Sequence, residues 1–253
     1  MDLNAQCVYD PRLGIVLYKN ALVNSPAIID RLENGLQQSF NPRFKWSLAT
    51  TGDENTDTSY RNCSDFKIHP DNTKWEMFPE IEDIKNITFE IKDILMCALY
   101  DYEVRYPAAN KMDFMESFNF VKYGPGEYFK PHTDHGFSYN ATVSCVLYLN
   151  DDYDGGELAF NSLGFKIKPK AGDLIFFPSN YIFVHSSEPV TSGMKYSVVT
   201  MFDYNERTHK NFQYGYNLDG SLADPNAGRG PRFTDKIVQP LKQLDADYRL
   251  IGV

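Results

Sequence analysis

His132 and Asp134 stand two residues apart, directly after a segment rich in aromatic residues. On a β-strand, residues i and i+2 project from the same face, so both side chains are predicted to grip one metal ion. A His-x-Asp pair also arises by chance, so the pair alone does not establish a metal site. Whether the pair binds a metal therefore depends on the other candidate ligands in the chain.

A second histidine, His185, follows the apolar run 181–184 and is predicted to end a strand beside the first pair. Two histidines and one carboxylate leave three coordination positions of Fe(II) open, as an oxygenase needs for a chelating cosubstrate and O2. A zinc hydrolase needs one open position, so the triad alone leaves that chemistry open.

Lys195 lies ten positions after His185, on the β-like run 195–199. A solvated lysine at a strand end is the commoner case when a lysine is considered alone. A buried ammonium, however, is costly unless it is paired, so a lysine inside an aromatic-walled barrel implies an anionic partner. With the triad upstream, the natural candidate is the distal carboxylate of 2-oxoglutarate.

Two amphipathic segments are predicted to support these residues. Ser25 and Pro26 begin a first helix near residues 26–40, because a capping serine precedes a proline at the first helical position. A second helix is predicted where apolar residues recur with a period close to 3.6 between Ile81 and Ala98.

After Tyr100 the chain changes to short runs rich in β-branched and aromatic residues, separated by turn residues. Many short strands with almost no helical pattern between them favour a jelly-roll or barrel over a parallel βαβ sheet. The predicted strands are 115–123, 142–149, 157–160, 165–168, 174–177, 182–185 and 196–202.

The length of 253 residues, with 42% hydrophobic residues, favours one domain with an ample core. We expect N-terminal support over 1–114, a catalytic β core over 115–204 and a C-terminal extension over 205–253 that ends with a short helix near 237–244. The extension is polar and rich in Gly, Asn and Asp at its start, and its role is open.

Composition narrows the partners and the compartment. A net charge of -9 disfavours nucleic acid, since phosphate binding needs clustered Lys and Arg. No apolar run is long enough to span a bilayer, and the first residues lack a signal sequence, so a cytoplasmic protein that does not bind membranes is expected. The four cysteines show no paired spacing, so neither a zinc knuckle nor a disulfide framework is indicated.

Taken together, the triad, Lys195 and Tyr123, nine positions before His132, resemble the prolyl-4-hydroxylase branch of the Fe(II)/2-oxoglutarate-dependent dioxygenases. The resemblance runs from about Phe118 to Asp203. Its further motifs are Tyr148-Leu149-Asn150, Gly155-Gly156-Glu157-Leu158 and the segment 171–178, Ala-Gly-Asp-Leu-Ile-Phe-Phe-Pro.

This resemblance implies an α+β, mainly β fold whose double-stranded β-helix (jelly-roll) core is buttressed by N-terminal helices. It implies that the triad His132, Asp134 and His185 binds Fe(II) and is catalytic. Lys195 and the hydroxyl of Tyr123 would then hold the 2-oxoglutarate carboxylate, assisted by Ser197 or Thr200. The cosubstrates would be 2-oxoglutarate and O2, and a need for ascorbate is left open.

The substrate is less determined, because three positions that are often polar or basic in peptide-proline hydroxylases differ here. They correspond to Phe129, to Ala141 or Asn140, and to Asp203. A prolyl residue in a peptide or protein is the first hypothesis, and a free amino acid or other small metabolite is the second. A non-catalytic jelly-roll binding module is the alternative from another class, and the oligomeric state is not indicated.

Overall fold

The computed structural model describes residues 3–51, 55–69, 78–109, 111–112, 114–136, 139–204, 243–244 and 250–251. The chain divides into two compact units, Met1–Phe212 and Gln213–Val253. In the second unit, the described residues form β19 (Gln243–Leu244) and β20 (Leu250–Ile251), which pair antiparallel. The helix predicted near 237–244 lies outside the described residues except for the last two positions, which belong to β19.

The first unit is mainly β, as predicted, with antiparallel strands. Within the described residues its larger sheet has nine strands in the order β1-β2-β15-β11-β18-β7-β5-β3, with β6 pairing along β18. The strands are β1 (Asn4–Cys7), β2 (Val16–Lys19), β15 (Leu174–Pro178), β11 (Val143–Tyr148), β18 (Lys195–Asp203), β7 (Phe118–Tyr123), β5 (Ser64–Ile68), β3 (Ser47–Leu48) and β6 (Phe114–Met115).

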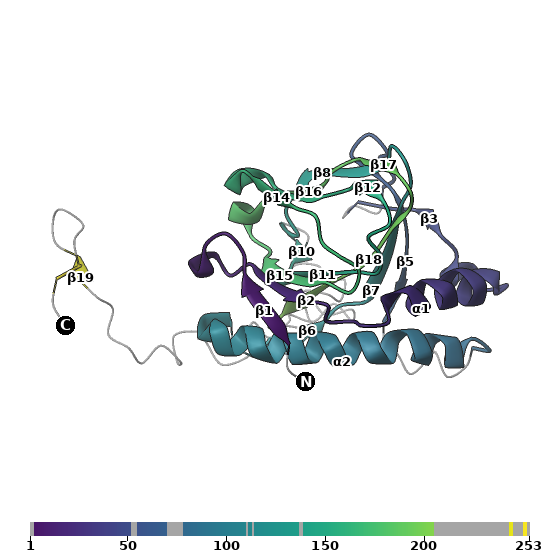
Figure 1. Cartoon of the computed structure of the whole chain (residues 1–253), viewed down its shortest axis with the longest axis horizontal. Helices are drawn as coiled ribbons and strands as arrows, with labels where there is room; N and C mark the ends of the chain where they lie inside the picture. The colour runs from purple at the N-terminus through teal and green to yellow at the C-terminus, as the bar shows by residue number, and fades with distance from the viewer. Residues whose placement is uncertain are drawn as a thin grey trace, which may run out of the picture. The chain divides into compact units, whose positions relative to one another are not determined.

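A smaller sheet lies across from the larger one, with the order β14-β13-β16-β8-β4 (Figure 1). Its strands are β14 (Phe165–Ile167), β13 (Leu158–Phe160), β16 (His185–Ser187), β8 (Tyr128–His132) and β4 (Arg61–Asn62). Two short ribbons complete the strands of this unit: β9 (His135–Gly136) with β10 (Tyr139–Asn140), and β12 (Asp154–Gly155) with β17 (Val190–Ser192).

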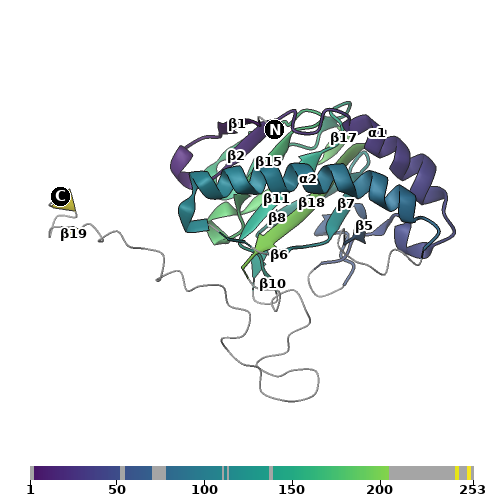
Figure 2. The ribbon, with the colours of Figure 1, turned by 90° about the horizontal axis from the view of Figure 1, so that it is seen from below.

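The long helix α2 (Ile81–Arg105) covers the outer face of the larger sheet (Figures 1 and 2). It begins at the predicted residue, and the predicted isoleucine stripe is its buried face. That stripe shares one core with the outward residues of the sheet, among them Phe118, Phe120 and Phe176. None of the helices in the described parts of the chain has the length and apolar character needed to span a bilayer.

The first predicted helix is present but irregular. Its α-helical part, α1 (Ser25–Asp30), has Pro26 in its first turn, as predicted. A π turn, Arg31–Gly35, and a 3-10 turn, Leu36–Gln38, continue it. Gly35 is a poor helix former, and the change of turn type falls at that residue.

Alternation along the central strands separates the outer core from an inner face. On β7, Phe118 and Phe120 join the core beneath α2, whereas Asn119, Val121 and Tyr123 line a cavity between the sheets. This is the period of two that a strand imposes on its side chains. The inner face of the larger sheet therefore presents a row of side chains to the smaller sheet.

Candidate metal centre

The cavity between the two sheets has a volume of about 840 Å³ and collects the residues singled out in the sequence. His132, Asp134 and His185 lie at its wall, and Lys195, Tyr123 and Ser197 line it as well. Residues from distant parts of the chain thus share one interior space.

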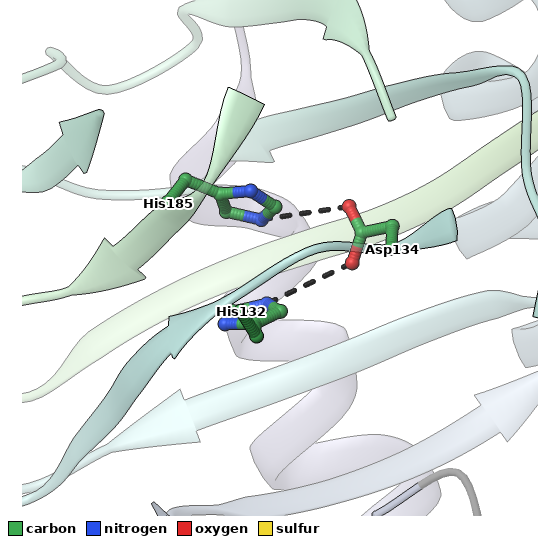
Figure 3. Close-up of side chains that lie close together, drawn as sticks. All are labelled: His132, Asp134 and His185. Carbon is green, nitrogen blue, oxygen red and sulfur yellow. Dashed lines mark ion pairs between the residues drawn. The ribbon is translucent and has the colours of Figure 1, made fainter. Parts of the chain in front are cut away.

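The three metal-binding candidates converge as predicted (Figure 3). His132 ends β8, His185 begins β16, and the two histidines pair directly across these neighbouring strands. Nε2 of His132 lies 3.7 Å and Nε2 of His185 lies 3.5 Å from the carboxylate of Asp134. One ligand atom from each residue lies within 4.8 Å of the others, a separation from which one ion can be held.

Two local predictions about this site were wrong. Asp134 lies beyond the end of β8 in a bend, so a turn and not strand alternation brings it to His132. His185 starts a strand and does not end one, because Tyr181–Phe183 forms a 3-10 turn. The side chain of Asn180 caps that turn by accepting a hydrogen bond from the amide of Ile182.

Backbone carbonyls orient both imidazoles for metal binding. Nδ1 of His132 lies 2.8 Å from the carbonyl oxygen of Lys130, and Nδ1 of His185 lies 3.0 Å from that of Phe183. A carbonyl only accepts, so each Nδ1 carries the hydrogen and each Nε2 presents a lone pair toward Asp134. Burial, with His185 as a further cause, holds the pKa of His132 well below its usual range and keeps the ring neutral at pH 7.

Asp134 is held by a pair of buried serines. The hydroxyl of Ser144 on β11 donates to Oδ2 of Asp134 at 2.6 Å, and Ser144 and Ser179 hydroxyls lie 2.7 Å apart. Ser144 and Ser179 are fully buried. The neighbouring His135 is exposed, and its Nδ1 lies 2.9 Å from the carbonyl oxygen of Ala141, so it does not join the triad.

Lys195 is buried as predicted, with 3% of its surface exposed. Its Nζ donates to the carbonyl of Gly156 at 2.8 Å and to the hydroxyl of Ser187 at 2.7 Å. Among the residues that the structure describes, no carboxylate lies within ion-pair distance of Nζ. Burial first, and the charge of Lys168 second, lower the pKa of Lys195 to about 7.

Tyr123 faces Lys195 across the β7–β18 pair, and Nζ lies 4.9 Å from the centre of its ring. Burial raises the pKa of Tyr123 well above its ordinary value, so its hydroxyl remains a hydrogen-bond donor at physiological pH. Ser197, two residues along β18, also lines the cavity. Thr200 does not, because it lies on the other face of β18 and donates to the carbonyl of Glu116.

Several cavity residues were not predicted. Ser187 escaped notice because the strand was expected to end at His185, whereas a strand starting there would have placed Ser187 on the same face. Arg61, on β4, lines the cavity, and its side chain makes an ion pair with Asp65 at 2.8 Å. Asn119 lines it from β7. Arg61 begins the segment Arg61-Asn62-Cys63-Ser64, which faintly resembles an Arg-Thr-Ser segment of the family, but no cavity position was predicted for it, and Asn119 stands in no motif.

Of the three positions that differ from peptide-proline hydroxylases, one lines the cavity and two are described as buried elsewhere. Phe129 lines the cavity, stacks on the imidazole of His132 with centroids 3.6 Å apart, and lies 5.0 Å from the guanidinium carbon of Arg61. Asp203 is buried and accepts a hydrogen bond from Thr142. Ala141 is buried and, like Asp203, does not line the cavity.

The fold and this site provide a candidate mononuclear metal centre, with two histidines and one carboxylate in the wall of an interior cavity. Comparison with protein families agrees, since residues 118–203 match the model of the 2OG-Fe(II) oxygenase superfamily. A PKHD-type hydroxylase of Herminiimonas arsenicoxydans is 30% identical over 128 residues, which cover 46% of this chain and 56% of that protein. Prolyl 3-hydroxylase 2 of Mus musculus is 41% identical over 64 residues, 23% of this chain and 9% of that protein.

Solved structures show the same fold. A Trichoplax adhaerens prolyl hydroxylase, in complex with a hypoxia inducible factor peptide fragment, has a TM-score of 0.57 at 18% identity and covers 76% of this chain and 84% of its own. The viral collagen prolyl hydroxylase of Paramecium Bursaria Chlorella virus-1 has a TM-score of 0.51 at 20% identity, covering 74% and 94%. Residues 118–203 are thus similar to 2OG-Fe(II) oxygenases, and the fold is similar to that of prolyl hydroxylases. The chain spans about half the length of the first curated relatives it matches.

Proposed function

We propose that this protein is an Fe(II)- and 2-oxoglutarate-dependent hydroxylase that acts on a prolyl residue of a peptide or protein. The observation that carries the proposal is one cavity with the ligand triad in its wall and, in its lining, a buried lysine that has no ion-pair partner among the described residues. We assign the strands that residues 115–204 contribute to the two facing sheets as a double-stranded β-helix core, supported by residues 1–114.

In this proposal His132, Asp134 and His185 hold Fe(II), and Lys195, Tyr123 and Ser197 receive the distal carboxylate of 2-oxoglutarate. The donor set fits the ion, because two imidazoles and one carboxylate suit Fe(II) and leave positions for other ligands. When bound, Fe(II) with 2-oxoglutarate and O2 supplies the oxidation that hydroxylates an unactivated C–H bond, with ascorbate as a candidate reductant.

The protein itself orients the cosubstrate and the metal ligands and excludes bulk water from the reacting atoms. Lys195 and Tyr123 orient the cosubstrate from its remote end, while the carbonyls of Lys130 and Phe183 fix the imidazole rings. Valines, a leucine and a methionine keep bulk water from the reacting atoms. These apolar cavity residues are Val121, Val146, Leu158, Val199 and Met201.

Two buried polar atoms support an amide-containing substrate. Nε of Arg61 and Oδ1 of Asn119 have no hydrogen-bond partner among the described residues, although both side chains line the cavity. Buried polar atoms normally have partners, so a ligand is expected to supply them. A peptide group offers both an acceptor for Nε and a donor for Oδ1.

The decisive experiment measures succinate formed from 2-oxoglutarate with Fe(II) and O2, using panels of proline-containing peptides and of free amino acids. Stimulation by a peptide, together with hydroxyproline in that peptide, is the expected result. Stimulation by a free amino acid alone would replace the peptidyl substrate with a metabolite. No turnover by folded, iron-loaded protein under any condition would favour a binding module.

The lowered pKa of Lys195 predicts that 2-oxoglutarate binding weakens as pH rises. Below pH 7 the ammonium is already charged and pairs with the carboxylate directly, whereas above its pKa of about 7 each binding event must first take up a proton. The affinity is therefore expected to fall up to about tenfold per pH unit above 7. Calorimetry of Mn(II)-loaded protein, in buffers of different ionisation enthalpy, should detect close to one proton taken up at pH 8 and little at pH 6.

The arginine variant is the control for this pH dependence. Lys195→Arg keeps its charge across the range, so any binding it retains should be nearly independent of pH between 7 and 9. Wild-type binding without proton uptake at pH 8 would show that Lys195 is not the group that pairs with the carboxylate.

Removing the serine behind Asp134 is expected to weaken metal binding without changing the ligand set. Ser144→Ala deletes the hydroxyl that donates to Oδ2 of Asp134, and loss of such an outer partner typically costs about 10- to 100-fold in metal affinity. Competition with a chelating dye for Mn(II) measures the effect. Thr142→Ala, on the same segment but bonded to Asp203, should bind as the wild type does.

A further inference from the structure

Ser187 lies on β16 two residues after His185, and both residues line the cavity. A step of two residues along a strand keeps side chains on one face and spans about 6.5 Å. Ser186, between them, is buried elsewhere and donates to Glu188. One short strand therefore carries a metal-ligand candidate and, further along the same face, a hydroxyl.

That hydroxyl lies beside two of the three residues already assigned to the distal carboxylate. Nζ of Lys195 donates to Oγ of Ser187 at 2.7 Å and lies 4.9 Å from the ring centre of Tyr123. Because Oγ accepts from the lysine, its own hydrogen is available for another acceptor. Ser187, Lys195 and Tyr123 thus form a cluster of three donors, which we call the donor cluster.

The donor cluster is buried, and it carries a positive charge when Lys195 is protonated. Ser187 is 9% exposed and Lys195 is 3% exposed. Within the described part of the chain, no carboxylate forms an ion pair with this lysine. Three converging donors without a counter-charge form a site suited to an anion that accepts several hydrogen bonds.

We propose that Ser187 is a specificity-determining residue that binds the distal carboxylate of the cosubstrate together with Lys195. This inference rests on the proposed function and adds a residue that selects the length of the keto acid. Since His185 and Ser187 share one strand, the backbone fixes the separation between the metal-ligand candidate and the hydroxyl, and we expect a keto acid on the metal to reach Ser187 only through a distal carboxylate. A shorter monocarboxylate would bind the metal without reaching Ser187.

The test compares 2-oxoglutarate with 2-oxobutanoate, which lacks the distal carboxylate, by calorimetry on Mn(II)-loaded protein. Ser187→Ala should raise the dissociation constant of 2-oxoglutarate about tenfold, as expected for one hydrogen bond to a charged group, and leave that of 2-oxobutanoate unchanged. Ser187→Thr keeps the hydroxyl and should recover most of the affinity. Ser186→Ala is the matched control on the same strand and should bind both acids as the wild type does.

The outcomes separate this inference from the function on which it rests. If Ser187→Ala lost the same affinity for both keto acids, Ser187 would only support the fold. If its affinity for 2-oxoglutarate were unchanged, Ser187 would have no role in binding. Either result overturns this inference and leaves the proposed function intact. Wild-type protein that binds metal but neither keto acid would overturn the proposed function as well. Thermal unfolding of each variant confirms that folded proteins are compared.

Discussion

Replacement of Asp134 by alanine is expected to abolish stable metal binding and all succinate formation while leaving the protein folded. Asp134 supplies the only carboxylate of the triad, and its two oxygens lie toward the two imidazoles at 3.7 and 3.5 Å. Without it the site retains only two imidazole ligands. The loss in affinity should exceed the about 10- to 100-fold that removal of an outer partner alone costs.

The fold should tolerate this change for a specific reason. Its partner Ser144 keeps a second hydrogen bond to Ser179, so the alanine leaves no buried hydroxyl without a partner. Metal content after dialysis, measured by elemental analysis, reports binding, and circular dichroism reports folding. A variant that retains one equivalent of metal would show that Asp134 is not a ligand.

His135→Ala is the matched control, because it removes the adjacent imidazole from the other side of the bend. That imidazole is exposed and lies against the carbonyl of Ala141. The control should therefore hold metal as the wild type does. Loss of metal in His135→Ala together with retention in Asp134→Ala would exchange the roles of the two residues.

Strong local patterns in the sequence predicted the elements that carry the site. The isoleucine stripe of α2 repeats over several turns, so its period is unambiguous and the helix begins at the predicted Ile81. Short apolar runs bounded by turn residues predicted β11, β13, β14 and β15 to within about two residues. The triad was predictable because His132 and Asp134 are close in sequence and the distant His185 follows a recognisable β motif.

Features that depend on tertiary contacts were not predictable. Tyr181 and Ile182 are apolar and suggested a strand, yet they are largely exposed in a 3-10 turn that Asn180 caps. Because the strand was predicted to end at His185, whereas it begins there, the position of Ser187 on the cavity face was not predicted. Similarly, β2 enters the larger sheet by pairing with β15, which is more than 150 residues later in the sequence. Long-range pairing of this kind leaves no local periodicity.

Replacement of Lys195 by methionine is expected to stabilise the protein while nearly eliminating 2-oxoglutarate binding. In the ligand-free protein the ammonium is buried without an ion-pair partner in the described residues, and burial lowers its pKa to about 7. An apolar side chain of similar length removes that cost, and replacing buried charges in this way is often worth about 1–4 kcal/mol. Loss of the charge that pairs with the carboxylate should cost about 2 kcal/mol or more, or about 30-fold in affinity.

The pH dependence of unfolding distinguishes this explanation from a generic gain in packing. The unfolded chain holds the proton of Lys195 up to its ordinary pKa of 10.5, whereas the folded protein releases it near 7. Between these values the unfolded state binds more protons, so wild-type stability rises with pH by up to about 1.4 kcal/mol per unit from this group. The advantage of Lys195→Met in chemical denaturation should therefore be largest below pH 7 and shrink toward pH 10. Lys166→Met, which removes an exposed ammonium, should show no such pH-dependent gain and should still bind 2-oxoglutarate. Two results would contradict the assignment of Lys195 as the partner of the 2-oxoglutarate carboxylate. The first is a Lys195→Met protein that is less stable than wild type at pH 6, and the second is normal 2-oxoglutarate binding by that variant.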